Sequence, residues 1–156
     1  MVRLILPVAL CPFLLDQATK WLVVHWLNLI ETRFMVIWEG YIYFIMAWNE
    51  GVNFGLFSDS SDQTRFILIG IALVICALVI YWTRTETNTI ALISAGLLLG
   101  GAMGNVVDRV LYGAVADFLN VTCCGIRNPF SFNVADITIF IGAFGLIIFA
   151  TDKKTA

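Results

Sequence analysis

Long apolar runs separated by short polar stretches fill most of this chain, and they predict helices that cross a membrane. Two runs, at 66–83 and 87–107, contain no charged residue. A third run, at 4–24, is interrupted only by Asp16 and Lys20, and it lacks the small-residue cleavage site of a removable signal peptide. A helix needs about 20 apolar residues to cross about 30 Å of hydrocarbon. We therefore expect all three runs to be transmembrane helices.

The fourth apolar run is too short to span a membrane by itself. Asp136 and Asp152 bracket only 15 residues, which make about 22 Å of helix at about 1.5 Å per residue. We therefore expect this helix to cover 131–151, which places Asp136 about one turn inside the membrane. A carboxylate at that depth costs about 2.5–3.5 kcal/mol on insertion scales, so it marks a functional site by default.

The segments between the runs leave two outer loops, at 26–65 and 108–130. The first loop holds two aromatic and partly β-branched stretches, 34–38 and 41–46, separated by Glu39-Gly40. Such a pattern is typical of a β-hairpin, and the tryptophans around it fit an interfacial aromatic belt. We interpret the hairpin either as a membrane anchor or as a platform over an active site.

The predicted fold class is an all-α membrane protein with four transmembrane helices and a small extracytoplasmic β-hairpin/loop subdomain, in a single domain over 1–156. Four spans place both chain ends on one side, which we expect to be the cytoplasm. Basic residues flank both faces, so the positive-inside rule alone does not decide the orientation. They are Arg3, Arg84, Lys153 and Lys154 at the inner ends, and Arg33, Arg65, Arg109 and Arg127 outside.

Composition narrows the function classes. The chain is 60% hydrophobic and 13% charged, with a mean hydropathy of +0.91, so a bilayer is its expected solvent. A net charge of −2 and the lack of a basic run argue against nucleic acid as a partner. The four cysteines and the single histidine have no metal-ligand spacing and form no evident disulfide framework. We expect neither a metal nor a cofactor.

Polar residues gather at the outer ends of three predicted helices, whose inner halves are nearly free of charge. Asp16 and Lys20 lie four residues apart, on one face of the first helix. The other members are Asn105, Asp108, Arg109, Asn133 and Asp136. This convergence predicts a polar site at the outer membrane face.

Two carboxylates in a partly dehydrated site favour acid–base chemistry. One stays protonated while the other ionises and activates a water, and their protons titrate as a coupled pair. Asp117 in the second outer loop and Asp136 are the natural pair if that loop folds back. For Asp16, next to Lys20, and for Asp108, next to Arg109, salt-bridge or helix-end roles are favoured.

Small residues recur at four-residue spacing in the third predicted helix, at Gly96, Gly100 and Gly104. Small residues let membrane helices approach closely. We interpret this stripe as packing within one chain, and we expect a monomer.

Five short sequence motifs occur in an order that resembles bacterial lipoprotein signal peptidase (signal peptidase II). The resemblance extends over nearly the whole chain, and the five motifs together are highly specific. They are Asp16-Gln17-Ala18-Thr19-Lys20, Asn49-Glu50-Gly51-Val52-Asn53-Phe54-Gly55, Gly104-Asn105-Val106-Val107-Asp108-Arg109, Gly113-Ala114-Val115-Ala116-Asp117-Phe118 and Phe132-Asn133-Val134-Ala135-Asp136. Asn53 stands where the family more often has a small residue.

The resemblance implies an aspartyl endopeptidase of the bacterial inner membrane, with its active site at the extracytoplasmic face. Such an enzyme removes the signal peptide from prolipoproteins just before a diacylglyceryl-modified cysteine. The implied partners are lipid-modified prolipoproteins, membrane lipids and globomycin-type peptide inhibitors. The implied catalytic pair is Asp117 and Asp136. The implied supporting residues are Asn49, Asn105, Arg109 and Asn133, with structural roles for Asp16, Lys20, Gly51 and Asp108.

Two other classes of function compete with a peptidase. A small proton- or ion-coupled transporter also uses membrane carboxylates, but it predicts polar residues through the whole bilayer depth rather than at one rim. A non-catalytic membrane scaffold leaves the aspartates at the rim unexplained. The sequence therefore favours the peptidase.

Overall fold

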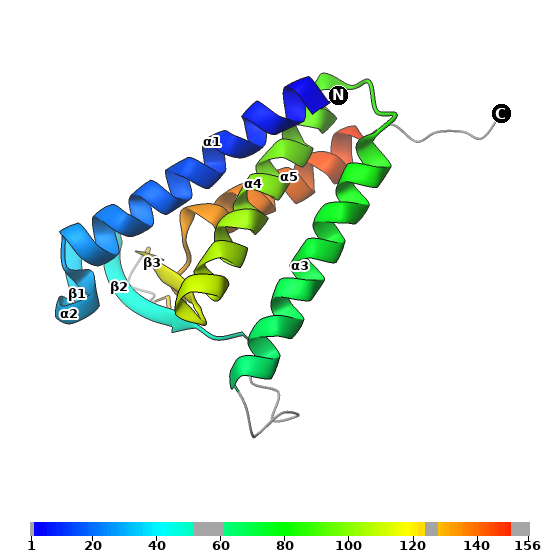
Figure 1. Ribbon diagram of the computed structural model, residues 1–156. Coiled ribbons are helices and arrows are strands. Elements are labelled where there is room, and N and C mark those ends of the chain that lie inside the picture. The colour runs from blue at the N-terminus through cyan, green and yellow to red at the C-terminus, as the bar shows by residue number, and fades with distance from the viewer. Residues whose placement is uncertain (1, 52–60, 124–127, 151–156) are drawn as a thin grey trace.

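The computed structural model describes residues 2–51, 61–123 and 128–150. It is mostly helical, with a three-stranded antiparallel sheet in the order β1-β2-β3 (Figure 1). The elements are α1 (Val2–Lys20), the π-helical turn η1 (Trp21–Trp26), α2 (Leu29–Thr32), β1 (Phe34–Trp38), β2 (Ile42–Asn49), α3 (Ser61–Thr83), α4 (Thr89–Tyr112), β3 (Val115–Val121) and α5 (Val134–Phe149).

The four long helices lie where the sequence predicts them, although their ends differ. In the described part of the chain, α3 and α4 are long and apolar enough to cross a membrane, and α5 is a shorter apolar helix. The helix α5 begins at Val134 and not at 131 as predicted, because Asn133 caps it. The Asn133 side chain accepts a hydrogen bond from the backbone N–H of Asp136. Asp136 therefore lies in the first turn of α5.

The helix α4 is central, and it packs along α1, α5 and α3 (Figure 1). Gly100 lies against the backbone of Ala9 in α1, and Gly142 of α5 lies against the backbone of Leu98 in α4. The predicted use of small residues for close helix packing is therefore confirmed for α4. Many large apolar side chains of α3 and α5 are exposed.

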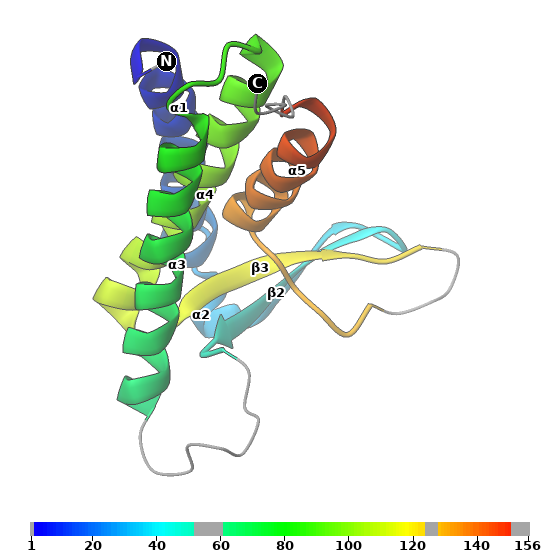
Figure 2. The same cartoon turned by 90° about the vertical axis from the view of Figure 1, so that its right-hand side faces the viewer.

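The predicted hairpin is present as β1 and β2, with Gly40 at a φ of +81° in its turn. The strand β3 was not predicted, because the second outer loop shows no hairpin pattern of its own. It pairs antiparallel with β2, so that Ala47 lies opposite Asp117. Figure 2 shows the sheet lying across one end of the helices. The second outer loop therefore does fold back onto the first one.

Two apolar clusters hold these parts together. One lies between α1, α3, α4 and α5, and includes Ala95, Leu98 and Leu146. The other fixes the sheet to η1 and α2 through Val24, Leu29 and Phe118, among others. The sheet is thus packed against the segment that follows α1.

The cysteines differ in state. Cys11 and Cys76 are free, whereas Cys123 is disulfide-bonded, which the sequence did not lead us to expect. Cys124 lies outside the described residues, as does Asn53.

Candidate active site

Asp117 lies in β3 and is almost fully buried, at 3% exposure. Its Oδ1 accepts a hydrogen bond of 2.6 Å from Asn133 Nδ2, and its Oδ2 accepts one of 3.0 Å from Asn49 Nδ2. The Asn49 amide is itself oriented, because its Oδ1 accepts the N–H of Gly51 at 3.0 Å. Gly51 has a φ of +103°, a conformation that favours glycine. Both Asp117 oxygens therefore receive a fixed amide donor.

Asp136 is half-buried in the first turn of α5 and takes part in a capping box with Asn133. Its Oδ2 accepts the backbone N–H of Asn133 at 3.2 Å, and its own N–H donates to Asn133 Oδ1 at 2.9 Å. Its Oδ1 accepts a hydrogen bond of 2.9 Å from Asn105 Nδ2. The helix start therefore fixes the position of this carboxylate.

Two asparagine side chains join the two carboxylates. Asn133 Nδ2 donates both to Asp117 Oδ1 and, at 3.2 Å, to Asn105 Oδ1. The other end of the Asn105 amide then donates to Asp136. The predicted pair, Asp117 and Asp136, is thus brought together by two of the predicted supporting residues, Asn105 and Asn133.

Burial raises the pKa of Asp117 to about 6, and the nearby charge of Asp136 adds to this effect. Hydrogen bonds from Asn49 and Asn133, and the charge of Lys20, act in the opposite direction. An Asp117 carboxyl with this pKa holds its proton to higher pH than an exposed aspartate does. Such a group is suited to share a proton within a carboxylate pair.

This raised pKa predicts how stability depends on pH. The folded protein binds the Asp117 proton more tightly than the unfolded chain, whose pKa is 3.8, so stability should fall as pH rises from about 4 to 6, by up to about 3 kcal/mol. The variant Asp117→Asn should lack this decline. Unfolding in detergent at pH 4.5 and pH 7 would measure it, with the exposed Asp62→Asn as control. An unchanged pH slope in Asp117→Asn would contradict the raised pKa.

Arg109 lies one turn beyond Asn105 on α4 and faces the same site. Its Nη1 makes a long contact of 3.4 Å with the carbonyl oxygen of Asn105. Its buried Nε has no hydrogen-bond partner among the described residues. Asp117 and Asp136 both act on it electrostatically. A guanidinium group with a donor to spare is therefore held close to both carboxylates.

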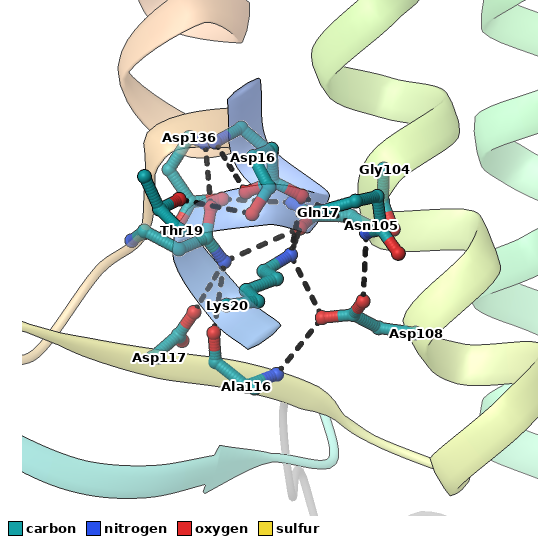
Figure 3. A network of polar contacts seen from close by, with 12 residues as sticks. Asp16, Gln17, Thr19, Lys20, Gly104, Asn105, Asp108, Ala116, Asp117 and Asp136 are labelled. Atoms are coloured by element: carbon teal, nitrogen blue, oxygen red, sulfur yellow. Dashed lines mark hydrogen bonds and ion pairs between the residues drawn. The ribbon is translucent and has the colours of Figure 1, made fainter. Parts of the chain in front are cut away.

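Asp16, Lys20 and Asp108 form a buried ion cluster behind the two carboxylates (Figure 3). Lys20 Nζ lies 2.8 Å from Asp16 Oδ2 and 2.7 Å from Asp108 Oδ2. Sequence proximity pointed to Arg109 as the partner of Asp108, but the ion pair is with Lys20, from another helix. Neighbours in a helix point in different directions, so adjacency in sequence does not make contact.

Sequence reasoning missed Gln17 and two backbone groups of this cluster. Gln17 Nε2 donates to Asp16 Oδ2 at 3.2 Å and to Asp108 Oδ1 at 3.1 Å. The backbone N–H groups of Ala116 and Ala135 donate to Asp108 and Asp16. Gln17 stands inside the first of the five motifs, and that was its only sequence signal. Among the described residues, no group of three or more His, Cys, Asp or Glu is arranged to hold a metal ion.

The fold and the site define the class of protein: a mostly helical chain, with helices apolar enough to cross a membrane and a buried polar site at one end of them. Two solved structures described as bacterial membrane enzymes, determined by the in meso method, share this fold. One, at 2.3 Å resolution, has a TM-score of 0.71 and 25% identity, covering 90% of this chain and 83% of that one. The other, at 1.9 Å resolution, has a TM-score of 0.76 and 24% identity, covering 90% and 88%.

The chain belongs to the signal peptidase II family, whose model, described as Signal peptidase (SPase) II, matches residues 8–151. The lipoprotein signal peptidase of Methylobacterium sp. (strain 4-46) is 37% identical over 143 residues, or 92% of this chain and 86% of that protein. The lipoprotein signal peptidase of Pelagibacter ubique (strain HTCC1062) is 37% identical over 154 residues, or 96% and 90%. Family membership makes this protein a peptidase, and thus a hydrolase, of lipoprotein processing.

Proposed function

We propose that this protein is an aspartyl endopeptidase that cleaves the signal peptide from diacylglyceryl-modified prolipoproteins, on the N-terminal side of the lipidated cysteine. The observation that carries the proposal is the pairing of Asp117 with Asp136 through the amides of Asn133 and Asn105. Family membership supports the peptidase class. Two linked carboxylates support a water-activating mechanism within that class.

In the proposed mechanism the two aspartates share one proton. The ionised carboxylate takes a proton from a water molecule as the water oxygen attacks the carbonyl carbon of the scissile bond. The protonated carboxyl donates its proton to the carbonyl oxygen. When the C–N bond breaks, the carboxyl that took the water proton gives it to the leaving amine. The other carboxylate takes one hydroxyl proton back from the collapsing intermediate, which restores the shared proton. Asp117, with its pKa raised to about 6, is the partner we propose to carry the proton first.

The substrate needs partners of its own beside the two carboxylates. Asn49 at the end of β2 is exposed and lies next to Asp117, so we propose that it contacts the substrate backbone. The buried Nε of Arg109 has no hydrogen-bond partner among the residues that the structure describes, so we propose that this guanidinium reorients to donate to a carbonyl oxygen of the substrate. A globomycin-type peptide, which presents similar backbone groups, is proposed to compete for these contacts.

The placement in the membrane is also part of the proposal. We propose four spans, formed by α1, α3, α4 and α5, in one domain over 1–156 that acts as a monomer. The start of α1 and the end of α5 lie at one end of the bundle, and the sheet lies at the other (Figure 1). We place the first end in the cytoplasm of a bacterial inner membrane. The polar site then faces the extracytoplasmic interface, where a lipid-anchored substrate presents its cleavage point.

Cleavage of a purified prolipoprotein tests the proposal. We expect the purified protein to cut a diacylglyceryl-modified prolipoprotein before its cysteine, as read by mass spectrometry of both products. The matched control is the same prolipoprotein without the lipid, which we expect to remain uncut. No product from the lipidated substrate would overturn the proposal. Equal cleavage of both substrates would show that the enzyme does not require the lipid.

A further inference from the structure

The residue before each proposed catalytic aspartate has its backbone N–H bound by a buried carboxylate. Asp108 Oδ2 accepts the N–H of Ala116 at 3.1 Å, one residue before Asp117. Asp16 Oδ1 accepts the N–H of Ala135 at 2.9 Å, one residue before Asp136. We call these two hydrogen bonds the amide anchors. Hydrogen bonds to an ionised acceptor are about twice as strong as those between neutral groups, so each anchor restrains its backbone segment.

A single ammonium group joins the two anchors. Lys20 Nζ touches Asp16 and Asp108 at 2.8 and 2.7 Å, and the Lys20 residue is 6% exposed. Gln17, one turn earlier on the same face of α1, bridges the same two carboxylates with its amide nitrogen. The strand that carries Asp117 and the helix that carries Asp136 are therefore both tied to the last two turns of α1 (Figure 3).

Lys20 also makes a third contact, which orients an amide in the site. Its Nζ donates to Asn105 Oδ1 at 3.2 Å. An ammonium group can only donate, so Asn105 must turn its oxygen towards Lys20. Its nitrogen then faces Asp136, to which it donates. Lys20 and Asn133 both donate to the Asn105 oxygen, and together they hold the Asn105 amide in this orientation. Loss of the Lys20 contact would remove one of these two restraints.

From these contacts we infer that Lys20 is a positioning residue that sets the separation of Asp117 and Asp136. It acts through the amide anchors at Ala116 and Ala135 and through the orientation of Asn105. Its effect on cleavage rests on the proposed function. A misplacement of about 1 Å in a reacting group can cost about 100-fold in rate, so loosening the anchors should lower kcat more than it changes KM.

Lys20→Arg separates positioning from charge. The guanidinium keeps the positive charge between Asp16 and Asp108. No single guanidinium nitrogen has the three N–H donors with which Lys20 Nζ reaches Asp16, Asp108 and Asn105. A cavity of about 260 Å³ beside Lys20, lined in part by Trp21 and Tyr112, gives the larger group room. We expect a folded protein whose kcat falls about 10- to 100-fold, with KM changed less than about two-fold.

The matched control is Arg84→Lys, an exchange of the same two residue types at an exposed position at the far end of α3. We expect it to keep wild-type kinetics. Wild-type kcat in folded Lys20→Arg would overturn the inference, because charge alone would then be sufficient.

Hydrogen–deuterium exchange tests the placement without any cleavage assay. The N–H of Ala135 lies in the first turn of α5, where helices supply no partner, so its protection depends on Asp16. Lys20→Arg should speed exchange in peptides covering 113–119 and 131–137, but not in the β1–β2 hairpin. Unchanged exchange in both peptides would overturn the inference, whether or not the wild type cleaves a prolipoprotein.

If Lys20→Arg does not fold, a second variant still tests the amide anchors. Asp108→Asn leaves Lys20 paired one to one with Asp16, so no buried charge is left alone. It weakens only one anchor, because the amide that replaces the carboxylate is a neutral acceptor. We expect faster exchange at 113–119 and wild-type exchange at 131–137. If the exchange rates of both peptides changed equally, or if neither changed, the inference that Lys20 joins two separate anchors would be contradicted.

Discussion

Replacing either Asp117 or Asp136 by asparagine is expected to abolish cleavage of the lipidated prolipoprotein. Each carboxylate serves as acid or base in the proposed mechanism, and such a group contributes about 100- to 10,000-fold to rate. An amide can neither take the proton from water nor return it. We therefore expect each single variant to lose about 100- to 10,000-fold in kcat, and the double variant to lose little more, because the two groups act as a unit.

This loss of activity is informative only if the variants are folded. Asn keeps the size of Asp and can still accept one hydrogen bond from Asn133, so each variant should elute and unfold like a native protein. Asp62→Asn, at the exposed start of α3, is the matched substitution and should keep wild-type activity. A folded Asp117→Asn or Asp136→Asn with more than a tenth of wild-type turnover would refute the two-aspartate mechanism.

Adding a single methyl group at Gly100 should strongly destabilise the protein. A Cβ at this position would clash with the backbone carbonyl oxygen of Ala9 and approach Pro12 Cγ to 2.6 Å. Backbone atoms cannot move aside as a flexible side chain can, so α1 and α4 would have to separate. Overpacking of this kind costs about 1–3 kcal/mol, and here it also shifts the helix that carries Asp16 and Lys20.

Thermal unfolding in detergent measures this effect, with Gly70→Ala as the matched control. Gly70 lies in α3, and a Cβ there would meet nothing within 4 Å. Alanine favours a helix by up to about 1 kcal/mol over glycine, so the control should be neutral or slightly stabilised. An unchanged unfolding temperature in Gly100→Ala would contradict the close approach of α1 and α4 at this position.

Several features of this protein follow from local sequence alone. Long apolar runs, two of them free of charge, place the four long helices, because the ability of a helix to cross a membrane depends on composition and length. Alternating aromatic and β-branched stretches around Glu39-Gly40 place the β1–β2 hairpin. The motif around Asp136 also contains the helix start, since Asn133 and Asp136 have the three-residue spacing of a capping box. That spacing could have moved the predicted start of α5 from 131 to Val134.

The site could be located from sequence only in part. The spacing of polar residues predicted that Asp16, Asn105 and Asp136 gather at one rim, and resemblance to the family pointed to Asp117. That Asp117 reaches the rim is decided by the pairing of β3 with β2. Strand pairing of this kind depends on a partner far away in the chain, for which the 108–130 segment carries no local pattern.

The sequence by itself determined the helices, the hairpin, the residue types of the site and, through five ordered motifs, the family. Only the tertiary structure decided which hydrogen-bond donor or cation each site carboxylate binds. It pairs Asp108 with Lys20, and it joins Asp16 to the backbone of Ala135 across 119 residues of sequence. Helical periodicity and capping act within a few residues, so sequence reveals them. Contacts between separate elements depend on how all of them pack, and no short stretch of sequence contains that information.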